Sequence, residues 1–581
     1  MNAAVAALLF VCISTVASVA FAFIHGNLNH AIAVASLSLG AISALAYLLV
    51  RPRAEKTTRF GAIDYLLFVA FAFFALRGFC WLVFAKDDDV CVLSPNNLGD
   101  MALHLTYIDY LIRGATFWPE NPIFSGIKLH YPLGADLFNA LLVLIGVATF
   151  RSLIWVGLVG SLLTCYALYK WGGWFAIAAF LFNGGFAALK FFKTGHFQDY
   201  QDSVEWKSFP LALFVTQRGL LYAIPVGLLL LNSWRLRWFS QPADDSEKTL
   251  PFWIEVLFYS TMPLFHVHTF LFLTFLLGFW TVAFKRRLEV AKLIVASIAP
   301  ATLLVANVTG LFERKSAYSA PLIHWQPGWM QADHNFFEFW WNNFGLFPVL
   351  GVALTIYMLW LVFFQKENAK AAAMFVIPSV LLFVVCCFVM FAPWDWDNTK
   401  LMLWCYLTVM PFIWEFLLKP LPTPSIVLSC ALLFFSGFIS LWGGLDKSHQ
   451  GYSIAQRSEV DPIGHAIRSI PAGETFAAFP TYNHPLLLLG CKVVEGYSGH
   501  LMSHGIRYEE RATKLHSLML GEPGWQYIAH ELGVHYLFWG RLEREAEEYA
   551  ASTQPWKSRC KVVASGEWGT IYDLTSLVSP K

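Results

Sequence analysis

Most apolar residues fall in long runs that recur from residue 4 almost to residue 443. A helix needs about 20 such residues to cross about 30 Å of hydrocarbon. Because only helices and closed barrels satisfy their backbone polar groups in lipid, we expect these runs to be membrane-spanning helices. The pattern predicts an all-α polytopic membrane bundle of about 13 spanning helices. Residues 1–60 hold two N-terminal helices and a basic link, and residues 61–445 form the main membrane domain.

The pattern changes after Ser458 to that of a small soluble α/β unit. Short β-type runs alternate with segments that carry charged faces, and Gly566 and Gly569 mark a closing turn. We therefore expect residues 446–581 to form a separate C-terminal α/β domain. The predicted elements are strands at 475–479, 492–494 and 535–539, helices at 508–520 and 542–551, and a hairpin at 561–573.

Basic residues between the apolar runs predict the orientation of the chain. Arg51, Arg53, Lys56 and Arg59 crowd the link before the third run, and such clusters face the cytoplasm in most membrane proteins. Further basic residues are consistent with this orientation, namely Lys285, Arg286, Arg287, Lys366, Lys370 and Lys419. We therefore expect an integral protein of a bacterial inner membrane, with the loop 86–135 and the C-terminal domain outside the cytoplasm.

The middle of the chain leaves alternatives open. Residues 136–190 hold two or three crossings, and residues 250–284 form either one long span or a hairpin that turns near His266. Two combinations of these options agree with the orientation of both ends of the chain. One combination places the polar stretch 190–208 outside the cytoplasm and the other places it inside, and we favour the outer side.

Composition excludes several classes of protein. Of the 581 residues, 57% are hydrophobic and 14% are charged, whereas about a quarter of a soluble protein is charged. The net charge of +1 is spread in short clusters, so nucleic acid is not an expected partner. Among the ten cysteines, Cys491 and Cys560 are the one pair that could form a disulfide, and no paired Cys-x-x-Cys indicates zinc.

The first outer loop carries the best candidate for catalysis. If the chain is helical from Gly99, Asp100 and His104 lie one turn apart on one face. A carboxylate at this level can act as general base for a substrate held partly in lipid. The alternative is that Asp100 caps the helix and His104 packs at the interface. His130 and Tyr131, just before the next run, are candidate substrate-binding residues.

A second charged cluster lies in the predicted outer connection at residues 392–400. Charges at this depth are costly unless they are paired or functional. One interpretation is an ion pair between Asp397 and Lys400 that closes a turn beside Asn398. Alternatively, Lys400 binds a lipid-linked phosphate, for which an ammonium is suited. The two interpretations are compatible.

Three more polar residues fall within or beside apolar runs. Arg218 either faces a polar or phosphate-bearing cavity or extends its guanidinium to the membrane surface, and we favour the cavity. His266 and His268 alternate along the chain rather than sharing one helical face, which disfavours a metal site formed by the pair. We expect at least one of these two imidazoles to be satisfied by a buried hydrogen bond.

The layout and several motifs resemble the GT-C superfamily of membrane glycosyltransferases, which includes protein O-mannosyltransferases and aminoarabinose transferases. The motifs that carry the resemblance are Gly99-Asp100-Met-Ala-Leu-His104, Tyr107, Gly114, Pro122, Tyr131-Pro132, Gln217-Arg218-Gly219, Pro263-Leu-Phe-His266-Val-His268-Thr269, Trp396-Asp397-Asn398-Thr-Lys400 and Gly533-Val-His-Tyr536. Two extra N-terminal helices precede the usual first helix of that group.

The resemblance implies an inverting transfer of a hexose or pentose from a polyprenyl-phosphate carrier to an envelope glycan, lipid or protein on the outer face. Asp100 matches the acidic residue of the first loop that serves as base in that group, with His104 assisting. The Asp-Glu pair of the O-mannosyltransferases is absent, because Met101 follows Asp100. The remaining candidates for substrate or phosphate binding are Arg218, Lys400, Asp397, Asn398, His266, His268, His130 and Tyr131. The resemblance implies no required cofactor, although a divalent metal is compatible with it.

Transport is the alternative class of function. A transporter or flippase for a lipid-linked sugar would use the same intramembrane charges to line a pathway. No inverted repeat is visible in the sequence, and no Gly-rich nucleotide loop indicates an ATP-driven pump. The large outer loop and the exported domain favour an enzyme.

Overall fold

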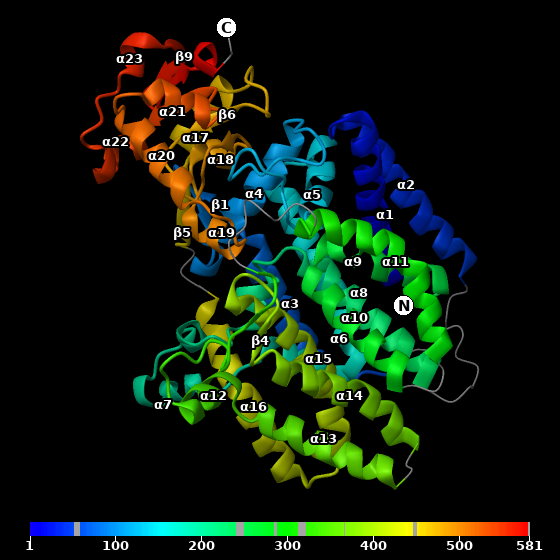
Figure 1. Cartoon of the computed structure of the whole chain (residues 1–581). Coiled ribbons are helices and arrows are strands. Elements are labelled where there is room, and N and C mark those ends of the chain that lie inside the picture. The colour runs from blue at the N-terminus through cyan, green and yellow to red at the C-terminus, as the bar shows by residue number, and fades with distance from the viewer. Residues whose placement is uncertain are drawn as a thin grey trace.

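The fold is known from a computed structural model that describes residues 1–51, 59–239, 249–283, 287–311, 321–364, 367–445 and 450–578. Arg53, Lys56, Lys285, Arg286 and Lys366, which contributed to the predicted orientation, lie outside these ranges. The described chain is mostly helical, as predicted, with the sheet of an α/β unit near its C-terminus (Figure 1).

Long apolar helices make up the membrane part because their mean hydropathy is high and their backbone hydrogen bonds close within each helix. Its principal helices are α1 (Asn2–His25), α2 (His30–Val50), α3 (Ala62–Cys80), α5 (Gly134–Leu144), α6 (Thr149–Leu181), α8 (Leu220–Trp234), α9 (Phe252–Phe265), α10 (Val267–Ala283), α11 (Arg287–Thr309), α12 (Phe336–Phe344), α13 (Phe347–Phe363), α14 (Glu367–Val385), α15 (Thr399–Ile413) and α16 (Thr423–Gly444). The shorter elements are η2 (Ala187–Lys190), α7 (Phe191–Thr194), η3 (Tyr200–Ser203), η4 (Phe209–Phe214), η5 (Arg235–Phe239), β3 (His324–Trp325), β4 (Val389–Met390), η7 (Asp395–Asn398) and η8 (Trp414–Leu418).

Seven helices in the described part of the chain are long and apolar enough to cross a membrane, or up to eight if the bent pair α12–α13 is one span. Four shorter apolar helices accompany them, including α5, α9 and α10. The integral membrane character is thus confirmed, whereas the total of 13 crossings stays a prediction.

The structure decides one of the two open alternatives in the middle of the chain. Residues 250–283 form a hairpin that turns at His266, because Tyr259 in α9 lies beside Thr274 in α10, with their hydroxyl oxygens 2.8 Å apart. Residues 136–190 hold most of the short helix α5 and the whole of the long helix α6, which has a kink at Gly173 (φ 62°), and the number of crossings there stays a prediction.

The polar stretch 190–208 packs against segments that the sequence places outside the membrane. The side-chain oxygen of Asn343, in α12, accepts hydrogen bonds from the backbone N–H groups of Glu205 and Trp206, at 2.8 and 2.7 Å. Trp396 donates its indole N–H to the Glu205 carbonyl at 2.9 Å. This stretch and these two loops therefore lie on the same side of the bundle, and that this is the outer side stays a prediction.

The first outer loop begins with a strand hairpin and continues into a helix. Its elements are β1 (Val83–Lys86), β2 (Asp89–Val92), η1 (Pro95–Asn97) and α4 (Leu98–Ile112). The predicted helix from Gly99 is confirmed, with its first residue one position earlier. Strand β2 also pairs with β5 (Tyr452–Gln456), the first strand after the last membrane helix. This three-stranded antiparallel sheet joins the loop to the C-terminal part of the chain.

The C-terminal unit, defined here as the described residues 450–578, contains a five-stranded sheet in the order β7-β6-β8-β10-β9. Strand β6 pairs in parallel with β7 and β8, and the remaining pairs are antiparallel. Its strands are β6 (Thr475–Ala477), β7 (Lys492–Val493), β8 (Tyr536–Gly540), β9 (Lys561–Gly566) and β10 (Gly569–Asp573). Its helices are α17 (Arg457–Ala466), α18 (Pro485–Leu488), α19 (Ser498–Ser503), α20 (Glu509–Leu520), α21 (Trp525–Glu531), α22 (Arg541–Glu545), η9 (Glu547–Tyr549), α23 (Trp556–Arg559) and α24 (Thr575–Val578).

The predicted strands, the hairpin and the helix at 508–520 correspond to observed elements, but the predicted helix at 542–551 is wrong. It ends after one turn because the backbone of Ala546 is extended (φ −67°, ψ 118°). The chain then turns so that the Tyr549 ring is buried beside Trp539. Cys491 and Cys560, the one pair that could form a disulfide, are not joined, because all ten cysteines, each at a described position, are free.

Backbone hydrogen bonds attach the C-terminal unit to the first outer loop. Val493 donates to the Pro122 carbonyl at 2.9 Å and accepts from the Ser125 N–H at 3.2 Å. Gly496 donates to the Ile123 carbonyl at 2.8 Å. Since these bonds extend the edge strand β7, the loop is held in place almost as an additional strand.

A glycine permits the closest approach between the unit and α4. Gly490 has a φ of +70°, and a Cβ there would lie 2.3 Å from the carbonyl carbon of Asp109. Lys492 forms an ion pair with Glu120 two residues farther on. The unit is therefore docked on the first outer loop by packing, by main-chain bonds and by charge.

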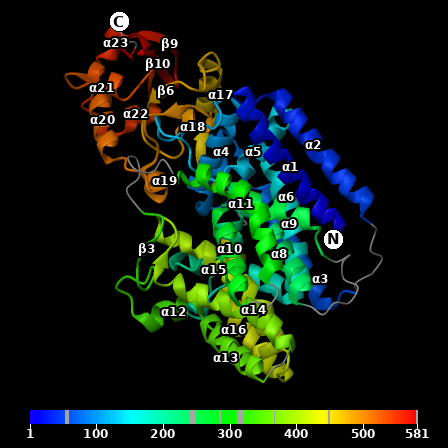
Figure 2. The same ribbon diagram turned by 45° about the vertical axis from the view of Figure 1, so that its right-hand side comes forward.

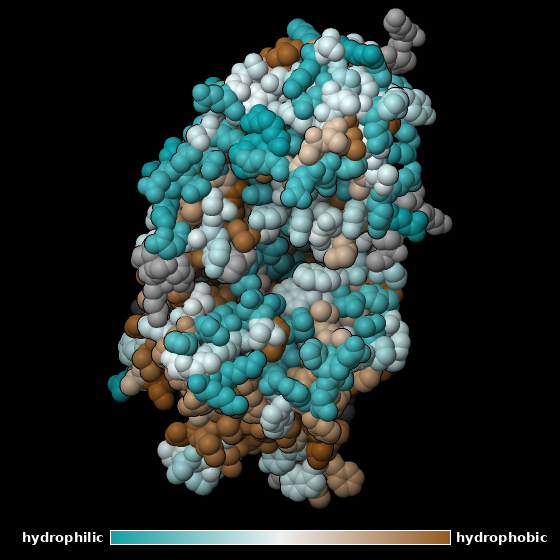
Figure 3. All heavy atoms as spheres, turned by 90° about the vertical axis from the view of Figure 1, so that its left-hand side faces the viewer, coloured by the Kyte–Doolittle hydropathy of each residue, from teal (hydrophilic) through white to brown (hydrophobic). Residues whose placement is uncertain are grey.

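Figures 1 and 2 show the C-terminal unit at one end of the molecule, with α19 at its edge nearest the membrane helices. Figure 3 shows the face that carries the unit and the loops around α7 and α12. Polar side chains cover its upper and middle parts, and apolar ones gather at its lower end. The surface is hollowed between the upper and the middle part.

Candidate functional site

Asp100 lies in the first turn of α4 and is half-buried. One carboxylate oxygen accepts a hydrogen bond from the side-chain amide of Gln217 at 3.2 Å. Gln217 lies in the short non-helical break between η4 and α8, so the sequence motif around Arg218 contacts the first outer loop. The amide orients the Asp100 carboxylate and leaves it additional acceptor positions for a substrate.

His104 lies one turn after Asp100, but its ring is fully engaged. Nδ1 lies 2.8 Å from a carboxylate oxygen of Asp136, and Nε2 lies 3.1 Å from the Thr216 carbonyl oxygen. Both neighbours are acceptors, so both nitrogens donate when the ring is the imidazolium cation. We therefore assign His104 a positioning and electrostatic role beside Asp100, in place of direct contact with substrate.

Lys400 stands in the first turn of α15, a helix whose side chains are all buried. Its ammonium lies 3.0 Å from a carboxylate oxygen of Asp397, so the predicted ion pair is present. Asn398 stabilises this turn, because its amide group donates to the Cys386 and Val389 carbonyls and its oxygen accepts from the Phe391 N–H. The Asn398 side chain thus holds the turn that presents Lys400.

The charges of these two segments act on Asp100. Burial raises the pKa of the Asp100 carboxyl above its ordinary value, and the negative charge of Asp397 adds to the rise. His104, Lys400 and the hydrogen bond from Gln217 offset part of it. The loop carboxylate and the α15 lysine therefore lie within electrostatic range of each other.

Tyr131 lies among the charged groups of this cluster. Its ring centroid is 5.0 Å from that of Tyr107 and 6.3 Å from that of His104. Burial raises the pKa of Tyr131 well above the ordinary value, and the carboxylates of Asp136, Asp100 and Asp397 contribute. Tyr131 thus remains a neutral hydroxyl in the midst of the three carboxylates.

Two histidines that the sequence analysis did not single out complete the cluster. His504 follows α19, and its ring centroid lies 5.6 Å from that of Tyr131. His500 lies on α19 against the start of α4, because a Cβ on Gly99 would stand 3.1 Å from its Nε2. Their four-residue spacing after a predicted strand is the signal that could have identified them.

Arg218 is buried where α8 meets α6 and α3. Its guanidinium donates to the Leu153 carbonyl at 2.8 Å and lies 5.8 Å from the Phe79 ring centroid. It borders an apolar cavity of about 240 Å³ between α1, α5, α6 and α8. Arg218 lies within electrostatic range of Asp136, the partner of His104, whereas Asp100 is coupled to Lys400.

The remaining candidates divide in the same way. His266 is buried and hydrogen-bonds through Nδ1 to Thr269, as expected for at least one of the pair. The rings of His266 and His268 lie 5.8 Å apart, within electrostatic range of Lys400. The Nδ1 atom of His130 lies 2.8 Å from the Asn307 carbonyl oxygen, which places its ring at the end of α11.

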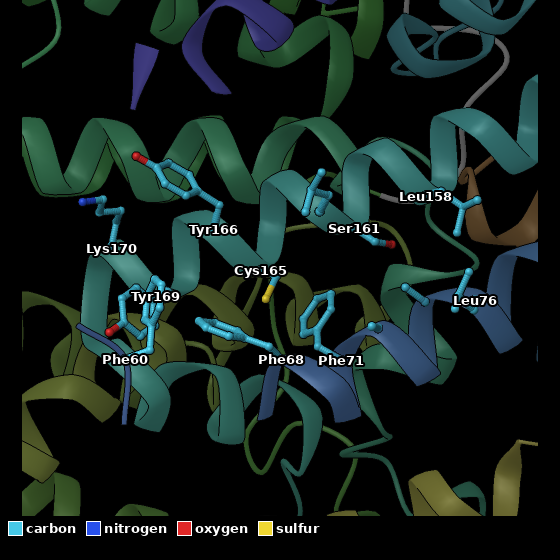
Figure 4. A pocket seen from close by; sticks show the side chains of 13 residues that line it. Phe60, Phe68, Phe71, Leu76, Leu158, Ser161, Cys165, Tyr166, Tyr169 and Lys170 are labelled. Carbon is cyan, nitrogen blue, oxygen red and sulfur yellow. The ribbon is translucent and has the colours of Figure 1, made fainter. Parts of the chain in front are cut away.

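A second apolar cavity is separate from this cluster. It has a volume of about 530 Å³ and lies between α3 and α6 (Figure 4). Phe68, Phe71 and Leu158 project into it, and Lys170 stands at one end. Its lining contains no carboxylate, so it lacks the acid or base that a transfer reaction needs.

No group of three or more His, Cys, Asp or Glu side chains is placed to hold a metal ion within the described ranges. The compatibility of the protein with a divalent metal therefore stays a prediction.

Comparison with solved structures finds proteins of similar fold. The archaeal oligosaccharyltransferase AglB from Archaeoglobus fulgidus, in complex with an inhibitory peptide and a dolichol-phosphate, is 10% identical with a TM-score of 0.46, covering 84% of this chain and 71% of its own. ArnT from Cupriavidus metallidurans bound to undecaprenyl phosphate is 13% identical with a TM-score of 0.45, covering 90% of this chain and 100% of its own.

No protein-family model matches the chain, and no curated protein matches it. At identities of 10% and 13%, the two similar structures assign no residue role, substrate or acceptor to this chain. The function proposed below is therefore argued from this protein's own side chains.

Proposed function

We propose that this protein transfers a sugar from a polyprenyl-phosphate carrier to an envelope acceptor, with Asp100 as general base. The observation that supports this most is the coupling of the half-buried Asp100 to Lys400 across two segments some 300 residues apart in sequence. A base and a cation that flank one space are what glycosyl transfer from a phosphate needs.

Lys400 is the group that we assign to the carrier phosphate. An ammonium has three donors and Asp397 takes up one, so two remain for phosphate oxygens. The N-terminus of α15 adds the positive end of a helix dipole at the same place. His266 and His268 lie within electrostatic range of Lys400.

The proposed reaction is an inverting displacement. The Asp100 carboxylate accepts the proton of the acceptor hydroxyl while the acceptor oxygen forms a bond to the anomeric carbon of a hexose or pentose. The bond from that carbon to the phosphate oxygen breaks with its electron pair, and polyprenyl phosphate departs beside Lys400. Asp100 then returns its proton to solvent. His104, held by Asp136 and Thr216, fixes the turn of α4 that carries the base.

We infer that the site faces the outer side of a bacterial inner membrane, where the loop charges place the first outer loop and the C-terminal unit. A glycan, a lipid or a protein of the envelope then supplies the acceptor hydroxyl. The donor arrives from the bilayer, so that its prenyl chain remains in lipid while its phosphate reaches headgroup depth.

The test is label transfer in proteoliposomes that contain the purified protein, a polyprenyl-phosphate sugar labelled in the sugar and an envelope extract. We expect label to appear in a carrier-free product together with one equivalent of polyprenyl phosphate. Movement of the intact labelled carrier across the bilayer without cleavage would instead establish a flippase and refute the transferase.

A further inference from the structure

The C-terminal unit brings two imidazoles to the proposed transfer site. Its helix α19 is followed by His504, and Figures 1 and 2 place this helix at the edge of the unit that faces the membrane helices. His504 contacts the Tyr131 ring and lies within electrostatic range of both Asp397 and Lys400. An element more than 100 residues after Lys400 in the sequence therefore lies beside the same group of charged side chains.

We propose that His504 donates a hydrogen bond to the carrier phosphate bound at Lys400, so that the C-terminal unit forms one wall of the donor site. This inference rests on the proposed function for its choice of ligand. The shared chemistry is a phosphate oxygen, which a lipid carrier or free phosphate could supply.

The position of His504 is fixed by the docking described above. The main-chain bonds of Val493 and Gly496 to the first outer loop lie a few residues before α19 in the sequence. The carbonyl oxygen of His500 accepts the backbone N–H of His504 at 3.0 Å and closes the turn that carries it. The imidazole is thus held by the same loop that holds Asp100, which is the kind of preorganisation that a binding site requires.

The charge state of the ring suits a phosphate beside a lysine. Burial, His500 and Lys400 lower the pKa of His504 to about 3, with Asp397 opposing them. The ring is therefore neutral at pH 7 and offers one N–H donor and one acceptor. A neutral donor can add to the bond made by Lys400 without the repulsion that a second cation would bring.

The experiment measures binding of undecaprenyl phosphate, which carries no sugar, to the full-length protein in nanodiscs. We expect His504→Ala to weaken binding about tenfold or more, as for loss of a hydrogen bond to a charged group. His504→Gln, which keeps an N–H donor, should recover most of the affinity. His530→Ala is the matched control, because His530 is an exposed histidine of the same unit.

Two comparisons separate the outcomes. Inorganic phosphate should displace the lipid only at far higher concentration, and displacement at equal concentration would refute a lipid source. Wild-type affinity in His504→Ala would overturn the proposal, whatever the transfer assay shows. Tight, His504-dependent binding in a protein that transfers no sugar would refute the proposed function and leave this inference standing.

Discussion

Asp100→Asn is expected to lower kcat by about 10²- to 10⁴-fold, the usual range for loss of a general base. The amide keeps the size of the side chain and a partner for Gln217, so the site should hold its shape. Binding of undecaprenyl phosphate should stay within about threefold of wild type, because Lys400 remains. Single-turnover kinetics with a labelled donor give the rate, and nanodisc binding gives the affinity.

The matched control is Asp87→Asn. Asp87 is exposed in the turn of the β1–β2 hairpin and has a φ of 53°, a backbone region that asparagine tolerates. It belongs to the same outer loop and should retain full activity. Equal losses in both variants, or full activity in Asp100→Asn, would remove Asp100 from the mechanism.

The pH profile distinguishes a base from a structural carboxylate. Because burial raises the pKa of Asp100, activity should fall as the pH drops through a value above the ordinary 3.9 of aspartate. Removing the negative charge of Asp397 removes one contribution to that rise. In Asp397→Asn the acid limb of kcat/KM should therefore move to lower pH, and a shift to higher pH would contradict the assignment.

Glu543→Ala is expected to destabilise the C-terminal unit by about 3–5 kcal/mol, as for breaking a buried ion pair. Glu543 and His484 are both fully buried, and Nε2 of His484 lies 3.0 Å from the carboxylate. The same carboxylate accepts the backbone N–H groups of Phe479 and Gly540, each at 2.8 Å. The substitution leaves all three donors without this partner.

Thiol labelling of the buried Cys491, quantified by peptide mass spectrometry in the full-length protein, measures this loss. Labelling should accelerate by about 10²- to 10⁴-fold, since 1.36 kcal/mol corresponds to a factor of ten. Glu545→Ala is the control, because Glu545 forms an exposed pair with Arg541 in the same helix, and its removal should cost less than about 1 kcal/mol. Equal rates in the two variants would contradict the role assigned to the buried pair.

The difference in the free energy of unfolding between wild type and Glu543→Ala should also depend on pH. Burial alone raises the pKa of Glu543, but the charge of His484 and the three hydrogen bonds outweigh it and lower the value in the folded protein. A lowered folded pKa contributes stability above the unfolded pKa of about 4.3, and this contribution is lost as the pH falls through the folded value. The gap between wild type and Glu543→Ala should therefore be full at pH 7 and shrink in acid.

Features that depend on residues close together in the sequence could be predicted. The apolar runs predicted the membrane helices, because these depend on helical periodicity alone. The same periodicity placed Asp100 and His104 on one face on the condition that the chain is helical from Gly99, and this condition is met. The hairpin turn at His266 was one of two alternatives. The strands of the C-terminal unit followed from short β-type runs between turns.

Features that depend on contacts between residues far apart in the sequence could not be predicted. Nothing near His104 in the sequence indicates that Asp136 and the Thr216 carbonyl engage both of its ring nitrogens. The pairing of β2 with β5 joins segments more than 350 residues apart, and this pairing helps bring His504 to the site. Arg218 is conspicuous in an apolar stretch, yet its contacts with Leu153 and Phe79 follow from helix packing.

A structure of the full-length protein with undecaprenyl phosphate in nanodiscs, determined by electron cryomicroscopy, tests the central claim most directly. The account predicts the phosphate in contact with Lys400 and His504, with the prenyl chain in the bilayer and Asp100 facing the same space. A phosphate bound instead at Arg218, or in the cavity between α3 and α6 that ends at Lys170, would contradict it.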